Sequence, residues 1–478
     1  MALTRREFVQ RSAAGAAALT LGPQLIETAS AATLTPAQLS ALKSAVRGQV
    51  FSPGTKGYAA AKQVFNARYN KGILPPAVVR VRDAADVQAV VAWANTHDIP
   101  LVPRSGGNAY NGASTSSSGV VVDLGGLDGV ALNGSGIATV GPGARNLDVY
   151  AALARRGAAI PSGSCPNVAV GGIATGGGMG LSGRALGLTL DRIVGIDVVT
   201  ADGRRQTVDA DTNPDLFWAL RGGGGSFGLV TAFRLRAKTV KRAAWFRASL
   251  PASSRADALA AWDALVPKGP SALTAICTLT PTGGFLEGQY FGSEAAMLAL
   301  IKPFSQLPGV KLRSGTMSWL PLQRYWAACA EGASNAQCID IAPQAFDASS
   351  IYISKPLTSA ARSAFVAAAN GGATLVCDAY GGKIDDVAPS ATAFVHRTVR
   401  FSVQIVSYTS IGTARTRVRA ARKRLVPYGN GQAYQNYTDL DLASPLTAYY
   451  GSNLPRLRQI KAEVDPDDRF QITQGIRP

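Results

Sequence analysis

Apolar residues in the first half of this chain fall into short runs separated by helical patterns. Between residues 75 and 239, runs of three to eight apolar positions bounded by glycine, aspartate or proline predict strands. The segment 86–96 instead repeats its apolar side chains at helical spacing, with Val87, Val91 and Ala94 on one face. The predicted strands are residues 78–81, 99–102, 120–124, 138–140, 193–200, 206–208 and 229–235, and the predicted helices residues 86–96, 147–156 and 216–220.

The pattern changes after residue 240. Several alternating runs separated by longer helices predict an antiparallel sheet backed by helices over residues 240–430. The runs are residues 274–280, 288–291, 373–378 and 401–408, and the helices residues 253–265, 294–304 and 359–369. Residues 32–74 read as a helical lead-in and residues 431–478 as a separate C-terminal segment. The predicted fold class is therefore α+β.

The N-terminus has the outline of an export signal. Arg5 and Arg6 precede a weakly apolar stretch from Ala13 to Leu21, and Ala29-Ser30-Ala31 is a plausible cleavage site. We interpret residues 1–31 as a twin-arginine signal, which predicts an extracellular or periplasmic protein. No apolar run approaches the roughly 20 residues of a membrane span, so none is expected.

The formal net charge of +18 raises the possibility of a nucleic-acid ligand. However, the densest basic run, residues 415–424, alternates its charges with small and apolar residues and contains no interleaved aromatics. We interpret it as the solvated face of a helix and expect no nucleic-acid partner. The 47% hydrophobic content and 16% charged content suit a large buried core.

Two glycine-rich turns carry the candidate chemistry. The first, Arg104-Ser105-Gly106-Gly107-Asn108, follows a predicted strand, where bare amides and an arginine can approach a diphosphate. The second presents Cys165 in a turn before two glycine clusters, so backbone geometry exposes the thiol. The clusters are Gly171 and Gly172, then Gly176, Gly177 and Gly178.

Other familiar motifs fail on context or spacing. Gly223 to Gly228 satisfies a dinucleotide fingerprint by letters, but a helix precedes it and a strand follows it, which is the reverse of the required order. His97 and His396 lie far apart and the cysteines lack C-x-x-C spacing, so no metal site is expected. There is no G-x-S-x-G hydrolase elbow.

Together the two turns resemble those of the berberine-bridge-enzyme-like flavoproteins, within the group of FAD-linked oxidases named after p-cresol methylhydroxylase (PCMH) and vanillyl-alcohol oxidase (VAO). Residues 434–439, 449–453 and 465–470 match the C-terminal signature of that family in the right order. The resemblance implies a PCMH-type FAD-binding domain of two α/β subdomains at residues 75–239. It also implies a substrate-binding domain at 240–430, and a C-terminal segment returning to the FAD domain.

The resemblance also implies an unusual cofactor linkage. Relatives bond FAD through a histidine in the first loop and a cysteine in the second, and here Asn108 stands at the histidine position while Cys165 matches the cysteine. A single 6-S-cysteinyl link through Cys165 is expected. Val168 matches the family position that gates oxygen, where a small residue favours an oxidase. Ile173 is a second departure, because relatives often carry a histidine there.

For catalysis, the resemblance points to Tyr434 as the residue that takes the substrate proton, with Asn436 and Tyr437 contacting the flavin. Gln404, on the strand after His396, is a candidate neighbour, and Tyr110 is a candidate lining residue of the substrate pocket. A packed core tyrosine is the alternative for Tyr434.

The sequence therefore predicts a secreted FAD oxidase. It would act on a small-molecule alcohol, either a sugar anomeric hydroxyl or a secondary-metabolite alcohol, and pass electrons to O2 to give H2O2. The alternatives are an amine or carbon-carbon-coupling oxidase, and a degenerate member that binds flavin without turnover. The oligomeric state stays open.

Five cysteines leave one unpaired thiol in an exported protein. Cys329 and Cys338 flank a short polar loop and are candidates to pair, and so are Cys277 and Cys377. Both pairings together would leave Cys165 for the flavin.

Overall fold

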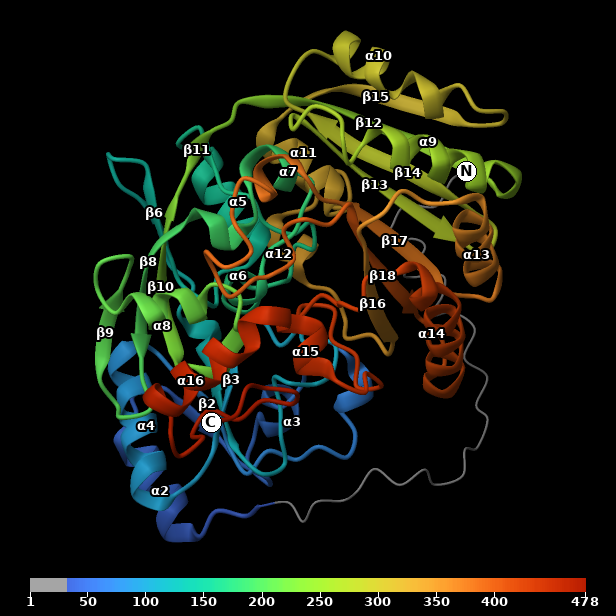
Figure 1. Ribbon diagram of the computed structural model, residues 1–478. Helices are drawn as coiled ribbons and strands as arrows, with labels where there is room; N and C mark the ends of the chain where they lie inside the picture. Colours follow the sequence, from blue (N-terminus) through green and yellow to red (C-terminus); the bar gives the residue numbers. More distant parts are fainter. Residues whose placement is uncertain (1–31) are drawn as a thin grey trace.

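The computed structural model describes residues 32–478, so the expected export signal lies outside the described residues. These residues form sheets of four, five, two and seven strands. Figure 1 shows the seven-stranded sheet and its helices on one side of the molecule and the smaller sheets on the other. The fold is the predicted mixture of α/β subdomains and a separate antiparallel layer.

The first subdomain is built on three parallel strands. They run in the order β2 (Val78–Arg80), β4 (Val120–Asp123) and β3 (Leu101–Arg104), with α4 (Ala84–His97) as the crossover helix. Asp83 caps this helix by accepting the amides of Ala85 and Asp86. The lead-in is not wholly helical, since β1 (Gln49–Phe51) adds an antiparallel edge strand beside β2. Its helices are α2 (Pro36–Ala45) and α3 (Tyr58–Ala61).

The second subdomain is an antiparallel sheet in the order β5-β6-β10-β8-β9. Its apolar face packs under the segments that carry the second glycine-rich loop. β8 and β9 meet at Gly203, whose φ of +81° suits the predicted tight hairpin. The strands are β5 (Val130–Leu132), β6 (Ile137–Val140), β8 (Ile193–Val199), β9 (Arg205–Val208) and β10 (Leu229–Arg236). The helices are α5 (Asn146–Ala154), α6 (Val170–Gly176), α7 (Gly183–Leu186) and α8 (Pro214–Leu220). A separate two-stranded sheet pairs β7 (Ala158–Ala159) with β11 (Lys238–Thr239).

The substrate layer is a seven-stranded, fully antiparallel sheet in the order β15-β12-β14-β13-β17-β18-β16. Side chains of alternate residues build a core with four helices on one face, and the opposite face turns toward the two smaller subdomains (Figure 1). The strands are β12 (Arg242–Pro251), β13 (Leu273–Thr280), β14 (Gly283–Tyr290), β15 (Lys311–Ser318), β16 (Asp347–Ile353), β17 (Thr374–Ala379) and β18 (Phe401–Ser407). The covering helices are α9 (Arg255–Leu265), α10 (Glu294–Ser305), α13 (Ser359–Asn370) and α14 (Ile411–Leu425).

Buried arginines join the two halves. Arg184, on α7, is 1% exposed and donates to five main-chain carbonyls of the substrate layer, among them those of Gly269 and Tyr380, each at 2.8 Å. Arg397 of the substrate layer forms a buried two-pronged ion pair with Asp191 of the flavin side. These contacts fix where β17 ends relative to the glycine-rich loops.

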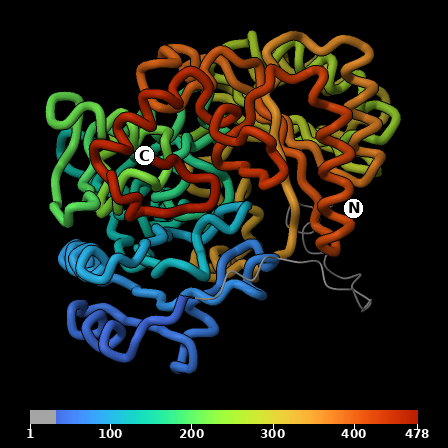
Figure 2. Tube along the Cα trace, turned by 60° about the horizontal axis from the view of Figure 1, so that its bottom comes forward, coloured from blue at the N-terminus to red at the C-terminus, as the bar shows by residue number. Residues whose placement is uncertain are grey.

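The C-terminal segment returns across the first subdomain, as Figure 2 shows. Phe470 forms a bridge with Leu101 of β3, and α16 (Leu454–Val464) packs on α8. Lys461 of α16 is fully buried and bonds to Ser226 O and to the carboxylate of Asp465, which is also fully buried. This lysine therefore joins the tail to the Gly223–Gly228 segment, which follows α8 and precedes β10 as the sequence indicates. The preceding short helix is α15 (Pro445–Tyr450).

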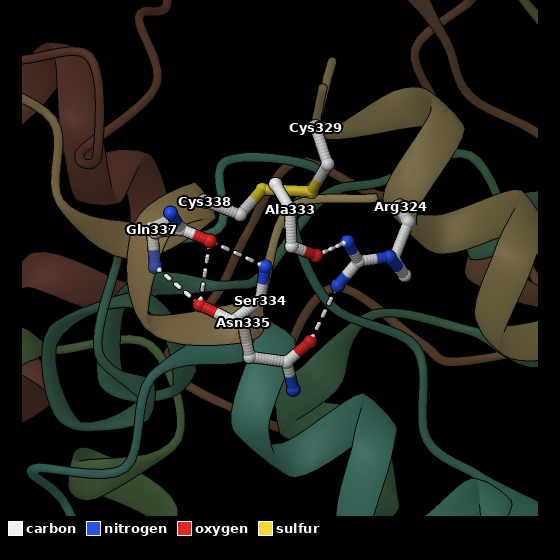
Figure 3. The surroundings of a disulfide bond; sticks show 7 residues. All are labelled: Arg324, Cys329, Ala333, Ser334, Asn335, Gln337 and Cys338. Carbon is white, nitrogen blue, oxygen red and sulfur yellow. Dashed lines mark hydrogen bonds between the residues drawn. A yellow bond between two sulfur atoms is a disulfide. The ribbon is translucent and has the colours of Figure 1, made fainter. Parts of the chain in front are cut away.

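A disulfide closes the loop between α11 (Trp319–Trp326) and α12 (Asn335–Ile339). Cys329 and Cys338 are bonded, and Arg324 braces the same loop by donating to Asn335 Oδ1 at 2.6 Å and to Ala333 O (Figure 3). The other candidate pairing is wrong: Cys277 and Cys377 remain thiols, although they face each other across β13 and β17. Among residues 32–478, no helix is long and apolar enough to cross a membrane.

We expect the substitution Lys461→Met to lower the free energy of unfolding by about 3–5 kcal/mol, because it strands a buried carboxylate without its cation. The control Lys383→Met breaks the exposed pair with Asp386 and should cost less than about 1 kcal/mol. Urea denaturation followed by tryptophan fluorescence measures both. Equal losses in the two variants would contradict the role given to Lys461.

Candidate functional site

One cavity of about 760 Å³ lies between the glycine-rich loops and the substrate sheet. This volume is in the range of sites for large organic ligands. Most of the residues predicted from the sequence meet on its walls. They are Ser105, Gly106, Gly107, Asn108, Tyr110, Cys165, Val168, Gly171, Gly172, Gly176, Gln404, Tyr434, Asn436 and Tyr437.

The two glycine-rich loops touch each other at one wall of the cavity. A Cβ added to Gly171 would lie 2.1 Å from Ser105 Oγ, and one added to Gly106 would lie 2.8 Å from the Ala169 amide nitrogen. Only glycine permits such an approach of two backbones. In contrast, a Cβ at Gly172 would meet no atom within 4 Å, so this part of the wall is open toward the cavity.

The wall fits a large ligand with polar edges, because it presents polar side-chain atoms that have no hydrogen-bond partner within the described residues. Asn108 Oδ1 is buried, and no residue in the range 32–478 donates a hydrogen bond to it. The Cys165 side chain is an exposed free thiol on the same cavity. An orphaned amide oxygen, an accessible thiol and bare glycine backbone are compatible with a flavin nucleotide lying along these loops.

Three residues predicted as cofactor contacts lie off the cavity wall. Arg104 does not line the cavity; β3 pairs in register with β4, and this places its guanidinium on Asp123 Oδ2 at 3.1 Å and on Ala61 O at 2.6 Å. Gly177 and Gly178 are also absent from the wall. They lie behind it, where the Gly178 amide donates to Tyr434 Oη at 2.9 Å.

Tyr434 is a buried residue that joins several segments. Its main-chain amide donates to Ser350 Oγ at 2.9 Å, while its hydroxyl accepts from Gly178 and from Asn436 Nδ2, the latter at 3.0 Å. Burial raises the pKa of its phenol, and the Gly178 amide opposes that shift only in part. With 2% of its surface exposed, Tyr434 forms part of the cavity floor and has limited access to a ligand.

Tyr437 is the less buried of the two tyrosines. It donates to Asp378 Oδ2 at 3.3 Å, and both residues line the cavity. Asp378 is 6% exposed and lies on β17, in register with Ile276 of β13. The sequence predictions missed Asp378 as a site residue, although a lone carboxylate at the end of the apolar run 373–378 was an available signal.

Gln404 and Tyr110 form a second polar pair on the cavity. Gln404 Nε2 donates to Tyr110 Oη at 2.6 Å. The Tyr110 ring stacks on that of Tyr437, with centroids 5.6 Å apart and planes 14° from parallel. Gln404 and Tyr110, both predicted from the sequence, therefore lie beside the pair formed by Tyr437 and Asp378.

The outer wall of the cavity is largely apolar. Phe346 packs edge-on against Tyr110, and the disulfide-closed loop contributes Ala327, Ala328 and Cys338. The Cys329–Cys338 disulfide therefore closes the loop that forms this part of the wall.

His396 serves the core and does not line the cavity. It stacks on Tyr352 with ring centroids 4.3 Å apart, and its Nδ1 bonds to Gln432 Oε1 at 3.0 Å. Burial lowers the pKa of the imidazole to about 4, so the ring is neutral near pH 7.

The fold and cavity define a flavin-dependent oxidoreductase of two domains with its site between them. The family described as "FAD binding domain" matches residues 75–209, and "Berberine and berberine like" matches residues 433–477. The chain belongs to the berberine-bridge-enzyme-like FAD-linked oxidoreductases.

Relatives span nearly the whole chain. Xylooligosaccharide oxidase of Thermothelomyces thermophilus is 30% identical over 442 residues, which cover 84% of this chain and 87% of the relative. Carbohydrate oxidase of Microdochium nivale is 29% identical, with 95% of this chain and 98% of the relative covered. Among solved structures, BBE-like 1 of Physcomitrella patens is 32% identical with a TM-score of 0.87, covering 92% of this chain and 98% of that one.

His396→Gln is expected to flatten the pH dependence of stability between pH 6.5 and 4. The unfolded chain binds a proton at a pKa near 6.5, whereas the folded protein resists protonation down to about 4, so wild-type stability falls as the pH drops through this window. The full effect is about 3 kcal/mol. Urea unfolding at several pH values measures it, and His97→Gln serves as the control. A wild-type-like slope in His396→Gln would disprove the assignment.

Proposed function

We propose that this protein oxidises an alcohol, either a sugar anomeric hydroxyl or a secondary-metabolite alcohol, with FAD as the electron acceptor and O2 as the final oxidant. The observation that carries the proposal is the hydrogen bond from Tyr437 to Asp378 on the cavity wall. A phenol that already donates to a carboxylate can take a proton from a substrate hydroxyl while passing its own to the carboxylate.

The remaining steps are divided among cofactor and protein. Bound flavin supplies the redox chemistry, accepting hydride from the substrate carbon and reducing O2 to H2O2. Tyr437 and Asp378 remove the hydroxyl proton, and Gln404 with Tyr110 orients the oxygen that loses it. Tyr434, expected from the sequence to be the base, instead positions Asn436 and the Gly178 backbone through its own hydroxyl.

An alcohol substrate is favoured over an amine or a carbon-carbon coupling because of this base. Oxidation of a tertiary amine removes no hydroxyl proton and needs no phenol and carboxylate pair. Relatives named as xylooligosaccharide, chitooligosaccharide and carbohydrate oxidases support a sugar as the alcohol.

The flavin is held by one covalent bond in this proposal. An asparagine at position 108 cannot form the histidyl link, which leaves the Cys165 thiol. Cys165 would hold the ring through a bond from its sulfur to flavin carbon 6; the thiol hydrogen and the carbon-6 hydrogen would be lost, and one O2 would accept both with two electrons to become H2O2. Val168, a small residue on the same wall, leaves room for O2. Attachment before export fits the twin-arginine signal proposed for residues 1–31.

Tyr437→Phe should lower turnover about 100- to 10,000-fold while the flavin absorbance stays unchanged, because proton removal is lost and flavin binding is not. Asp378→Asn should lower turnover by a comparable factor, since a neutral amide can accept a hydrogen bond from Tyr437 but cannot take up its proton. Tyr434→Phe is the matched tyrosine comparison: it leaves the buried Gly178 amide without its acceptor, so it should lower stability and cost turnover about tenfold, well short of the loss in Tyr437→Phe. Anaerobic flavin bleaching by xylobiose, chitobiose and simple aryl alcohols, followed by admission of air, measures each rate.

Two outcomes would overturn this assignment. If Tyr434→Phe is inactive and Tyr437→Phe is active, Tyr434 is the base. If no member of a broad alcohol panel bleaches the flavin of the wild-type protein, the proposed activity fails as a whole.

Mass analysis of the Cys165 peptide tests the link. We expect acid-precipitated protein to stay yellow and the peptide to be heavier by one FAD less two hydrogens. Cys165→Ser should release its flavin to the supernatant, whereas Cys277→Ala, which changes a buried thiol away from the cavity, should not. Flavin in the wild-type supernatant would contradict a covalent bond.

A further inference from the structure

The loop that carries Cys165 is seated on the start of α5. The amides of Asn146 and Leu147 donate to Val168 O at 2.9 Å and to Pro166 O at 3.4 Å. Side chains of the same helix take two more carbonyls, because Asn146 Nδ2 donates to Cys165 O at 3.2 Å and Tyr150 Oη to Gly163 O at 3.0 Å. The first turn of a helix has unpaired amides, and here the cysteine loop supplies their acceptors.

Arg145, the residue before this helix, connects that seat to the other flavin loop. Its Nη1 donates to Asn167 O at 2.7 Å in the cysteine loop and to Gly106 O at 3.2 Å in the loop that carries Asn108. No carboxylate within residues 32–478 forms an ion pair with it, so the two carbonyls are its main partners. Burial lowers the pKa of the guanidinium, and the charges of Asp123 and Asp148 partly oppose this.

Very little space separates the parts that Arg145 joins. A Cβ placed on Gly106 would lie 2.6 Å from Asn108 Oδ1 and 2.7 Å from Arg145 Nη1. The guanidinium therefore lies beside the asparagine that stands where a second covalent anchor is expected. A single nitrogen thus bonds to both loops at the place where they pack against each other.

We propose that Arg145 is a positioning residue for flavin attachment: it holds the two loops at the separation that brings the Cys165 sulfur to carbon 6 of the bound ring. The inference rests on the thioether proposed above. A histidyl bond would fix the first loop to the ring directly, and in this chain the arginine fixes it to the cysteine loop. Arg145 makes no contact with the reacting atoms in this role.

The test compares Arg145→Met, Arg145→Lys and the wild-type protein. Each is purified, incubated with FAD in air and sampled over time for the ratio of flavin-bearing to unmodified Cys165 peptide. We expect attachment to be about tenfold slower in Arg145→Met, because charge-assisted bonds to both loops are lost. Arg145→Lys should be partly restored, since one ammonium can still donate to both carbonyls. The control Arg192→Met removes an arginine that bonds to Arg236 O away from the cavity.

The outcomes separate this inference from the one it rests on. A wild-type peptide without flavin overturns the thioether and the role of Arg145 with it. A flavin-bearing wild type with an equal rate in Arg145→Met overturns the positioning role alone. Thermal melting of each variant in a Cys165→Ser background detects a general loss of stability. If attachment slows in proportion to the fall in melting temperature in both Arg145→Met and Arg192→Met, the positioning role is also overturned. If Arg145→Met does not fold, Arg145→Lys and Arg145→Gln decide by the same ratio.

Discussion

The site depends on the buried contacts of Tyr434, which join its own segment to the Gly178 amide through the hydroxyl and to the substrate sheet through the main-chain amide. Its own amide is held by Ser350 of the substrate sheet, and Asn436 donates to the same oxygen. Gly177 and Gly178 take φ values of +144° and +93° to bring this amide into place, a conformation that only glycine adopts without strain. Because the Tyr437 amide also donates to Tyr434 O, the position of the proposed base follows from this buried contact. The buried Tyr434 therefore helps to fix where Tyr437 lies on the cavity wall.

Antiparallel register explains why the polar residues of the substrate sheet converge. Val376 pairs with Gln404, and Asp378 with Ser402, on neighbouring strands of one sheet. Side chains two residues apart share a face, so Asp378 and Gln404 both point toward the flavin loops while Cys377 points into the helix-covered core. A shift of one residue in β17 would bury the carboxylate among apolar helices, at a prohibitive desolvation cost. The helix-covered core on one face of the sheet thus fixes which polar side chains the other face presents to the cavity.

The sequence predicts the local parts of this structure well. The strand, helix and strand at residues 78–104 are predicted correctly because their pattern of apolar residues is local. The two glycine-rich loops can be recognised from their composition. What it misses is set by contacts between distant segments. Arg104 reads as a diphosphate ligand until register places it on Asp123, and β1 is too short to show a pattern. The sequence points to Tyr434 as the base and to Tyr437 as a flavin contact, and the approach of Asp378 to Tyr437 depends on two distant segments meeting. The Cys277 and Cys377 thiols face each other without bonding, which no spacing rule could decide.

Two arginines near the site use the same chemistry. Arg145 joins the two glycine-rich loops, and Arg184 joins α7 to the substrate layer. Each bonds to main-chain carbonyls, and neither has an ion pair among the described residues, although Arg184 is buried and Arg145 half-buried. A carbonyl is a dipole fixed in the backbone, so each bond specifies where a loop lies as well as how strongly it is held. The planar guanidinium presents several donors in fixed directions, and an ammonium does not. Their value to the site is therefore geometric, because bonds to fixed carbonyls place the segments beside the cavity in a defined arrangement.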